Sequence, residues 1–260
     1  MQYDYIKVER DAAIMVLTIA RPEVLNAIHP RVSREIGAAF EAFEGDPSQH
    51  VAIITGAGDR AFSAGNDLKY QSSNGEDDGP RVAFGGITDR PDFKKPVIAA
   101  VNGLAFGGGF EIALACDIIV AAEHATFALP EPRVGLAAVG GGLLRLPRAI
   151  GLNRAMEIIL TSRHVGAEEG RQLGFVNHVV PTGGALDAAK ELARAIAGNS
   201  QYAVRAARSI ARANFHKPLP QAMKDQWEDA EFKAMLASPD VVEGPRAFAE
   251  KRAPRWANVE

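Results

Sequence analysis

The chain has 260 residues, 47% of them apolar, and a formal net charge of −3. This length and apolar content allow one large domain, or one domain with a smaller appendage, built around a sizeable core. The slightly acidic balance provides no electrostatic attraction to nucleic acid or to an anionic membrane, so neither is expected as a partner.

Cysteine, histidine and hydropathy patterns narrow the class further. The single cysteine, Cys116, excludes an intrachain disulfide and is expected to be a small buried residue. The N-terminal residues lack the basic and apolar regions of a signal peptide, and no apolar run reaches the roughly 18 residues of a membrane span. The histidines are scattered without metal-ligand spacing, so no metal site is expected. These features favour a cytoplasmic protein.

The first half of the chain alternates predicted strands and helices. Short runs of β-branched and apolar residues bounded by glycine, proline or polar turns predict strands, and an apolar stripe at helical spacing predicts a helix after Pro30. The predicted elements are strands at Ile6–Val8 and Ala13–Ile19, a helix at Pro30–Glu44, a strand at Val51–Thr55, a turn and short helix at Arg60–Lys69, a mobile surface loop at Gln71–Pro80, a strand at Val97–Val101, a helix at Phe110–Cys116, and strands at Asp117–Val120 and Thr126–Ala128.

The second half is predicted to be almost wholly helical. A rigid corner at Pro130–Pro132 and a second triglycine at Gly140–Gly142 precede it. Strand–helix alternation followed by helices alone predicts an α/β core with a helical appendage. The predicted helices are Leu143–Ile150, Asn153–Thr161, Ala167–Leu173, Gly184–Ala197, Tyr202–Asn214, Leu219–Leu236 and Asp240–Lys251.

The stretch Val97–Val120 contains the first candidate functional residue. The triglycine Gly107–Gly109 lets the backbone approach a ligand closely and leaves N–H groups free at the positive end of the predicted helix. Glu111, in the first turn of that buried helix, is costly to desolvate unless the protein uses it. The pattern predicts an oxyanion-binding turn with an acid or base beside it. The alternative is a plain turn, with Glu111 stabilised only by the helix dipole.

Several motifs follow one another along the chain, and together they resemble the crotonase, or enoyl-CoA hydratase/isomerase, superfamily. Each motif alone is weak, but their order and spacing are specific for the superfamily, and the resemblance covers nearly the whole chain. The motifs are Arg21–Ala27 (RPEVLNA), Phe62–Lys69 (FSAGNDLK), Val101–Gly103 (VNG), Gly107–Glu111 (GGGFE) with Ala113, Cys116 and Asp117, Phe127–Glu131 (FALPE), Gly140–Gly142 with Leu146 and Pro147, and Phe248–Arg252 (FAEKR).

The resemblance implies an α/β (α+β) fold in which ββα units wind into a spiral. It implies an acyl-CoA-binding catalytic core over residues 1–195 and a helical oligomerisation region over residues 196–260. The assembly expected from it is a homo-trimer, or a hexamer made of two trimers. The expected substrate is a small-molecule acyl-CoA thioester, with coenzyme A as part of the substrate and no tightly bound cofactor.

The resemblance also assigns catalytic roles. Glu111 and Glu131 match the two carboxylates of the hydratase branch: Glu111 would orient and activate the water, and Glu131 would supply the α-proton. The backbone N–H groups of Asn66 and Gly108 would form the oxyanion hole. Without the resemblance, Glu131 would be interpreted as a solvated corner between two prolines.

Further positions are expected to contact the CoA moiety or the acyl group. Core packing at a strand end is an equally good interpretation of Val24, Leu25 and Ala27, and a solvated side chain explains Lys69 as well. Lys251 is expected to reach the CoA of a neighbouring subunit. The full set is Val24, Leu25, Ala27, Ala64, Asp67, Leu68, Lys69, Val139 and Lys251.

The sequence departs from the hydratase pattern at one place. Ala138 and Val139 replace the Pro-Gly pair that commonly precedes the second glycine cluster, and the bulk of valine near the acyl pocket could alter acyl size or reaction. The segments Leu129–Glu131 and Leu143–Pro147 are also similar to the carnitinyl-CoA dehydratase subgroup.

The leading hypothesis is reversible hydration of a trans-2-enoyl-CoA to a 3-hydroxyacyl-CoA. The same fold leaves open carnitinyl-CoA-type dehydration, Δ3-Δ2 isomerisation, and hydroxycinnamoyl-CoA hydratase-lyase cleavage. A catalytically silent homologue that binds RNA or protein is the non-enzyme alternative. Two matched glutamates argue against silence, and the acidic balance argues against RNA.

Overall fold

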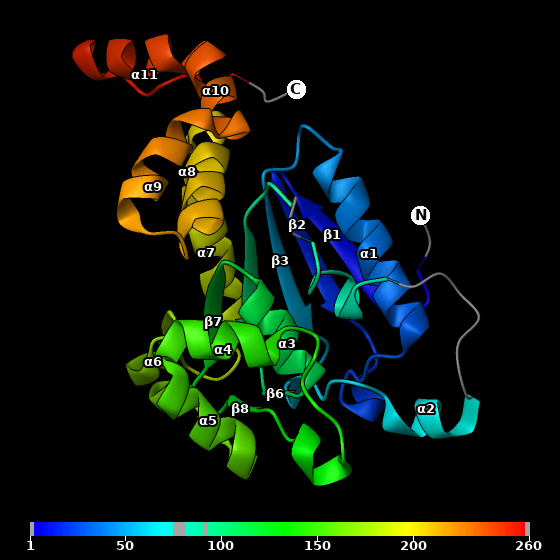
Figure 1. The fold of residues 1–260 in the computed structure, drawn as a ribbon. Helices are drawn as coiled ribbons and strands as arrows, with labels where there is room; N and C mark the ends of the chain where they lie inside the picture. The colour runs from blue at the N-terminus through cyan, green and yellow to red at the C-terminus, as the bar shows by residue number, and fades with distance from the viewer. Residues whose placement is uncertain (1–2, 75–81, 91–92, 258–260) are drawn as a thin grey trace.

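The structure is a computed structural model that describes residues 3–74, 82–90 and 93–257. Two sheets form its centre, and helices cover them (Figure 1). The strands are β1 Ile6–Asp11, β2 Ile14–Ile19, β3 Val51–Gly56, β4 Ala61–Ser63, β5 Val97–Val101, β6 Leu104–Phe106, β7 Ile118–Ala122, β8 Thr126–Ala128, β9 Val165–Gly166 and β10 His178–Val180. The α-helices are α1 Pro30–Glu44, α2 Leu68–Asn74, α3 Gly108–Ala115, α4 Gly142–Ile150, α5 Leu152–Thr161, α6 Ala167–Leu173, α7 Ala185–Ala197, α8 Gln201–Asn214, α9 Leu219–Asp225, α10 Ala230–Ala237 and α11 Asp240–Ala249. The 3-10 helices are η1 Pro22–Val24, η2 Phe84–Gly86, η3 Glu131–Val134 and η4 Gln226–Glu228.

The larger sheet has the strand order β1-β2-β3-β5-β7-β10. Strand β1 is antiparallel to β2, and the strands from β2 to β10 are parallel to their neighbours. Every residue of β3 and β5 is buried, as expected for parallel strands covered on both faces. One face packs against α1 and α3, and the other packs against the alanine stripe of α7.

The smaller sheet has the order β4-β6-β8-β9, and its strands alternate along the chain with those of the larger sheet. Thus β3 leads into β4, β5 into β6 and β7 into β8, which is the repeated ββα arrangement that the family resemblance implied. The first three strands of this sheet are parallel, so their carboxyl ends lie at one edge. The segments that follow those ends carry Asn66, Gly108 and Glu131.

Most predicted elements are confirmed, and the differences have physical causes. Strands β4 and β6 were not predicted, because each has only three residues and pairs with a strand distant in the sequence. Strands β9 and β10 interrupt the helical second half and were not predicted. Each is very short and pairs with a strand far away in the sequence, so the local pattern does not reveal it. The helix predicted over Leu219–Leu236 breaks at Asp229, whose carboxylate accepts the Phe232 N–H (3.0 Å) and begins α10. The predicted loop 71–80 is helical to Asn74, and its remainder lies outside the described residues.

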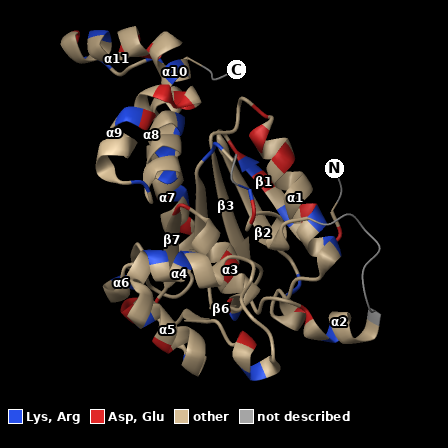
Figure 2. Cartoon of the chain, viewed as in Figure 1, with Lys and Arg blue, Asp and Glu red and all other residues tan. Residues whose placement is uncertain are grey.

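In Figure 1 the C-terminal helices α8 to α10 extend upward from the core, and α11 lies across their far end. Acidic and basic residues are interspersed along them, whereas β3 and β7 carry none (Figure 2). None of the helices in the described part of the chain combines the length and hydropathy needed to cross a bilayer.

Candidate active site

A cavity of about 1080 Å³ opens where the N-terminus of α3 meets η2, η3 and α4. It contains five of the residues singled out from the sequence: Asn66, Gly108, Glu111, Glu131 and Val139. The other lining residues are Gln71, Val82, Ala83, Phe84, Thr88, Asp89, Leu136, Ala137, Gly140, Gly141, Leu144, Arg145, Arg148 and His216.

Glu111 is a buried carboxyl, 4% exposed, in the first turn of α3. Its Oε1 accepts the Gly142 N–H at 2.8 Å. Burial raises the pKa of Glu111, while hydrogen bonds from the Gly142 and Gly140 backbones and the charge of Arg145 counteract part of that rise. A Cβ at Gly140 would lie 2.6 Å from Glu111 Oε2, so the second triglycine leaves the room this carboxyl needs.

Glu131 enters the same cavity from η3, where the chain turns after β8. Its Oε2 is buried and has no hydrogen-bond partner in the described part of the chain. Burial raises the pKa of Glu131, and the charge of Glu111 raises it further. The two carboxyls therefore interact across one space, and this can keep one protonated while the other is ionised.

The backbone N–H groups of Asn66 and Gly108 lie on two turns that touch each other. A Cβ at Gly65 would lie 2.8 Å from Gly108 N, so the close approach of the turns requires glycine. Gly107 adopts φ 53° and ψ −124°, and Gly108 then begins α3, where a backbone N–H has no acceptor within the helix. Within the described residues, neither N–H has a hydrogen-bond acceptor. Two free donors thus belong to residues that line the cavity holding both carboxyls.

The remaining predicted contact residues lie outside the lining of this cavity. Val24 and Leu25 form the turn at η1, next to the segment that carries Ala64, whose N–H donates to Leu25 O at 2.9 Å. Lys251 lies beyond α11 with φ 53°. The other members of this group are Ala27 and Asp67, which are buried, and Leu68 and Lys69, which are exposed at the start of α2.

The structure adds cavity residues that the sequence did not indicate. Phe84 lies against Gly108, because a Cβ there would be 2.2 Å from the ring. Arg145 donates to Thr88 O (2.7 Å) and to Gly140 O (3.3 Å), so it ties the segment after η2 to the second triglycine. Only the doublet Gly85-Gly86, both with positive φ, could have indicated from the sequence that this segment is special.

Among residues 3–74, 82–90 and 93–257, no three metal-ligating side chains gather closely enough to hold a metal ion. What the cavity offers from the described chain is therefore hydrogen-bond donors, two carboxyls of raised pKa and an aromatic wall. Such a set can stabilise a developing oxyanion and move protons beside it.

Comparison with known proteins gives consistent results. Residues 9–259 match the enoyl-CoA hydratase/isomerase family. The chain is 44% identical over 257 residues to a carnitinyl-CoA dehydratase of Salmonella arizonae, covering 96% of this chain and 97% of that protein. A carnitinyl-CoA dehydratase of Escherichia coli K12 is also 44% identical, over 253 residues, covering 95% of this chain and 96% of that protein.

Solved structures agree with the sequence relatives. An enoyl-CoA hydratase of Mycobacterium tuberculosis H37Rv superposes with a TM-score of 0.92 at 41% identity, covering 98% of this chain and 99% of that one. An enoyl-CoA hydratase of Mycobacterium marinum gives the same TM-score, identity and coverage. The family model spans nearly the whole chain, and the sequence relatives and the fold agree with it. The chain therefore belongs to the enoyl-CoA hydratase/isomerase, or crotonase, family.

Proposed function

We propose that the protein is a hydro-lyase that reversibly adds water across the Cα–Cβ double bond of an enoyl-CoA thioester. One observation carries the proposal: Glu111 and Glu131, both with raised pKa, share a cavity with two unpaired backbone N–H groups. Conjugate addition of water to a thioester requires a base, an acid and stabilisation of the enolate oxygen, and this site offers all three.

The reaction follows from these groups. The thioester oxygen accepts hydrogen bonds from the N–H groups of Asn66 and Gly108. Ionised Glu111 takes a proton from water as the water oxygen bonds to Cβ, and the double-bond electrons move to form the enolate. Protonated Glu131 then donates its proton to Cα, and the enolate returns to a thioester. Transfer of the proton from Glu111 to Glu131 completes the cycle, and the reverse sequence is the dehydration.

The CoA moiety is proposed to run from the oxyanion pair over the turn at Val24 and Leu25 and along the start of α2. The residues next to these two segments along the chain are proposed to contact the CoA moiety as well: Ala27, Ala64, Leu68 and Lys69. Lys251 does not line the cavity, and its proposed contact, which follows from the family resemblance, is to the CoA of a neighbouring subunit.

A carnitinyl-CoA-type dehydratase is the second candidate. The 44% identity to two such proteins supports it. Phe84 and Asp89 also line the cavity, and an aromatic face and a carboxylate both attract a quaternary ammonium group. Arg145 and Arg148 line it too, and their charges repel such a group.

A substrate pair separates the two candidates. Hydration of crotonyl-CoA, and of its analogue bearing a γ-trimethylammonium group, is followed by loss of the conjugated thioester absorbance. Preference for crotonyl-CoA supports the simple hydratase, and preference for the ammonium compound supports the carnitinyl type. If a folded preparation hydrates neither compound, and no longer or aromatic enoyl-CoA either, the proposed reaction is contradicted.

A further inference from the structure

The motif Arg21–Ala27 is not explained by its proposed CoA contact alone, because the side chains of Arg21 and Asn26 bond to other parts of the protein. Asn26 is completely buried, and its Nδ2 donates to Ala57 O (3.0 Å) and Ala61 O (2.8 Å). Its Oδ1 accepts the Arg21 N–H at 3.0 Å. The motif is thereby fastened to the start of β4, the strand that leads to Asn66.

The backbone after Asn26 then pairs with the segment that carries the oxyanion donor. Ile28 N–H donates to Gly65 O (2.8 Å), and Asp67 N–H donates to Ile28 O (3.0 Å). These bonds make a parallel bridge between Ile28 and Asn66. Because successive peptide groups of an extended chain point in opposite directions, the N–H of Asn66 must face away from Ile28. Asn66 itself lines the cavity.

A nearly buried ion pair holds the far side of this turn. Arg21 Nη1 lies 2.9 Å from Asp67 Oδ2 and 2.5 Å from Ala27 O, and the two side chains are 14% and 10% exposed. The other oxygen of Asp67 accepts the Tyr70 N–H at 3.0 Å, at the start of α2. Asp67 thus has both oxygens engaged by the protein, on the residue directly after Asn66.

The electrostatics of the pair keep it ionised. Burial alone would raise the pKa of Asp67, but the hydrogen bonds from Tyr70 N–H and Arg21, together with the charge of Arg21, lower it overall. Breaking such a pair leaves an uncompensated charge with little access to water, so the backbone around it must rearrange.

We propose that Arg21 and Asp67 are positioning residues of the oxyanion hole: their ion pair fixes the direction in which the Asn66 N–H points. They act through the backbone and need not touch the substrate. This inference rests on the proposed function, since it assigns a task to the Asn66 N–H. A shift of the donor by a fraction of an ångström weakens stabilisation of the enolate more than it weakens binding of the ground-state thioester.

The decisive variants are Asp67→Asn, Arg21→Met and Arg21→Lys. The control is Asp117→Asn, which removes a charge of similar exposure that pairs with Arg208 (2.9 Å; side chains 12% and 19% exposed) and with Arg212 (2.8 Å). None of these three residues lines the cavity. Circular dichroism and thermal unfolding establish that each variant is folded.

Two measurements test positioning. One is kcat and KM for hydration of the enoyl-CoA that the wild type prefers. The other is the red shift in the absorbance of bound 4-dimethylaminocinnamoyl-CoA, which grows as hydrogen bonds polarise the thioester carbonyl. We expect Asp67→Asn and Arg21→Met to lose about 10- to 100-fold in kcat with little change in KM, and to lose most of the red shift. Asp117→Asn should keep both, whatever its stability.

Arg21→Lys is the rescue variant. A single nitrogen of Arg21 makes both the Asp67 and the Ala27 contacts, and a lysine ammonium can also donate to two acceptors. It should recover a large part of kcat and red shift relative to Arg21→Met.

The possible failures are distinguishable. Wild-type kcat and red shift in folded Asp67→Asn overturn the positioning role. An equal loss of kcat and red shift in Asp117→Asn would attribute the effect to general stability, and so would a failure of Arg21→Lys to recover them relative to Arg21→Met. Either result also overturns the positioning role. Absence of both red shift and hydration in the wild type refutes the proposed function itself.

Discussion

Glu111 and Glu131 occupy an environment that favours their neutral forms, although the proposed chemistry needs one of them ionised. We expect Glu111→Gln and Glu131→Gln each to lower kcat/KM for hydration by at least about 10²-fold, because each removes a proton-transfer group while keeping size and polarity. The double variant should lose far less than the product of the two single losses, since the two groups act as a unit. Steady-state assays on folded preparations measure this. Near wild-type turnover of either single variant removes that residue from the mechanism.

The raised pKa of Glu111 also predicts a pH-dependent stability difference. Between the unfolded pKa of about 4.3 and the higher folded pKa, the native state binds more protons than the unfolded state. The free energy of unfolding of the wild type should therefore fall, relative to Glu111→Gln, as pH rises through this window. Glutamine can still accept the Gly142 N–H and carries no charge to desolvate. Denaturant unfolding from pH 4 to pH 8 measures the difference, and one that does not change with pH contradicts the prediction.

Residue-level prediction succeeded where a residue type was unusual for its local position. Glu111 in an apolar helix and the two triglycines were visible in the sequence, whereas Glu131 and Asn66 were singled out only by the family resemblance. The structure brings Glu111, Glu131, Asn66 and Gly108 to one cavity. Phe84 and Arg145 were not predicted, because an aromatic residue and an arginine are ordinary in their local context. Arg145 meets Thr88, 57 positions away, only after the chain has folded.

Among the elements, the first turn of α3 matters most, because its shape determines access to the Gly108 N–H. We expect Gly108→Ala to fold but to lose turnover by roughly 10²-fold, since the new methyl group enters the cavity beside the donor. It would also meet the edge of the Phe84 ring at 2.2 Å.

Phe84→Ala separates these two effects. Adding Gly108→Ala to the Phe84→Ala background should leave stability unchanged and still reduce turnover. Gly166→Ala, at a glycine with no atom within 4 Å of a new Cβ, is the neutral control. If Phe84→Ala restores the activity of Gly108→Ala to that of Phe84→Ala alone, the clash explains the defect and the oxyanion assignment fails.

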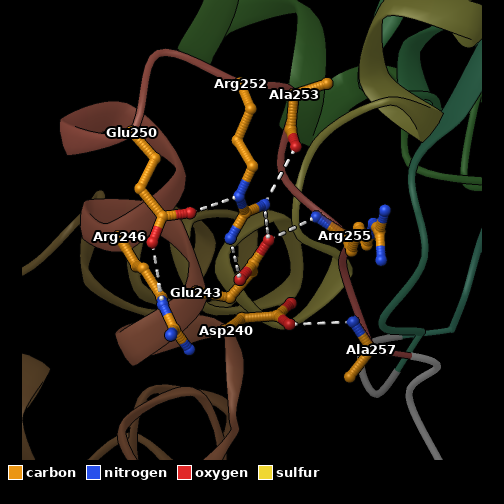
Figure 3. Close-up of polar contacts among 8 residues, drawn as sticks. All are labelled: Asp240, Glu243, Arg246, Glu250, Arg252, Ala253, Arg255 and Ala257. Atoms are coloured by element: carbon orange, nitrogen blue, oxygen red, sulfur yellow. Dashed lines mark hydrogen bonds and ion pairs between the residues drawn. The ribbon is translucent and has the colours of Figure 1, made fainter.

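A second prediction at this scale concerns the segment that follows α11 (Figure 3). Arg252 donates to both oxygens of Glu243 (2.6 and 2.9 Å), and Arg255 N–H donates to Oε1 at 2.7 Å. Asp240 accepts the Ala257 N–H at 2.9 Å and the Ser200 hydroxyl at 2.6 Å, so the tail, α11 and α8 meet at one carboxylate. The tail is therefore held by a few charged contacts.

Hydrogen bonding from Arg252 lowers the pKa of Glu243 to about 2. The contribution of ionised Glu243 to the stability of the folded state is complete above the unfolded carboxyl pKa, and it is lost as pH falls toward 2. At neutral pH, Glu243→Gln should accelerate amide exchange over residues 252–257 while leaving β3 and β5 protected. Glu168→Gln, which alters the exposed Arg171 pair, is the control. Unchanged exchange in the tail would show that Glu243 does not hold it.

The helical second half shows where element prediction reached its limit. Strand β10 has three residues, too few for an alternating pattern, and it exists because β7 offers an open edge some 58 positions earlier in the chain. The break before α10 depends on Asp229, which caps the start of that helix. The apolar pattern of the sequence continues through this position and therefore predicted one uninterrupted helix. By contrast, α1 and α6 were predicted to the residue, because proline or glycine marks their ends.

At the scale of the whole molecule, the C-terminal helices expose several large apolar side chains. Phe248 is 87% exposed, Leu219 72%, Val242 68% and Trp227 61%, all on α9 to α11 or η4. These helices extend away from the sheets in Figure 1, so nothing in the described part of the same chain covers those side chains. Large apolar side chains concentrated in one region mark an association surface.

We expect this surface to join identical chains into a closed trimer, or into a hexamer of two trimers. Different faces of α9 to α11 must then pair in a ring, because a surface that met only its own copy would stop at a dimer. Sedimentation velocity at micromolar concentration should show a species of about three or six times the 27.7 kDa chain mass.

Val242→Asp and Phe248→Asp should shift the protein toward monomer, because a carboxylate would be buried at the interface. Leu160→Asp, at an exposed leucine of α5 (67%), is the control and should leave the trimer intact. A monomeric wild type, or equal dissociation by Leu160→Asp, would show that the C-terminal helices do not assemble the molecule.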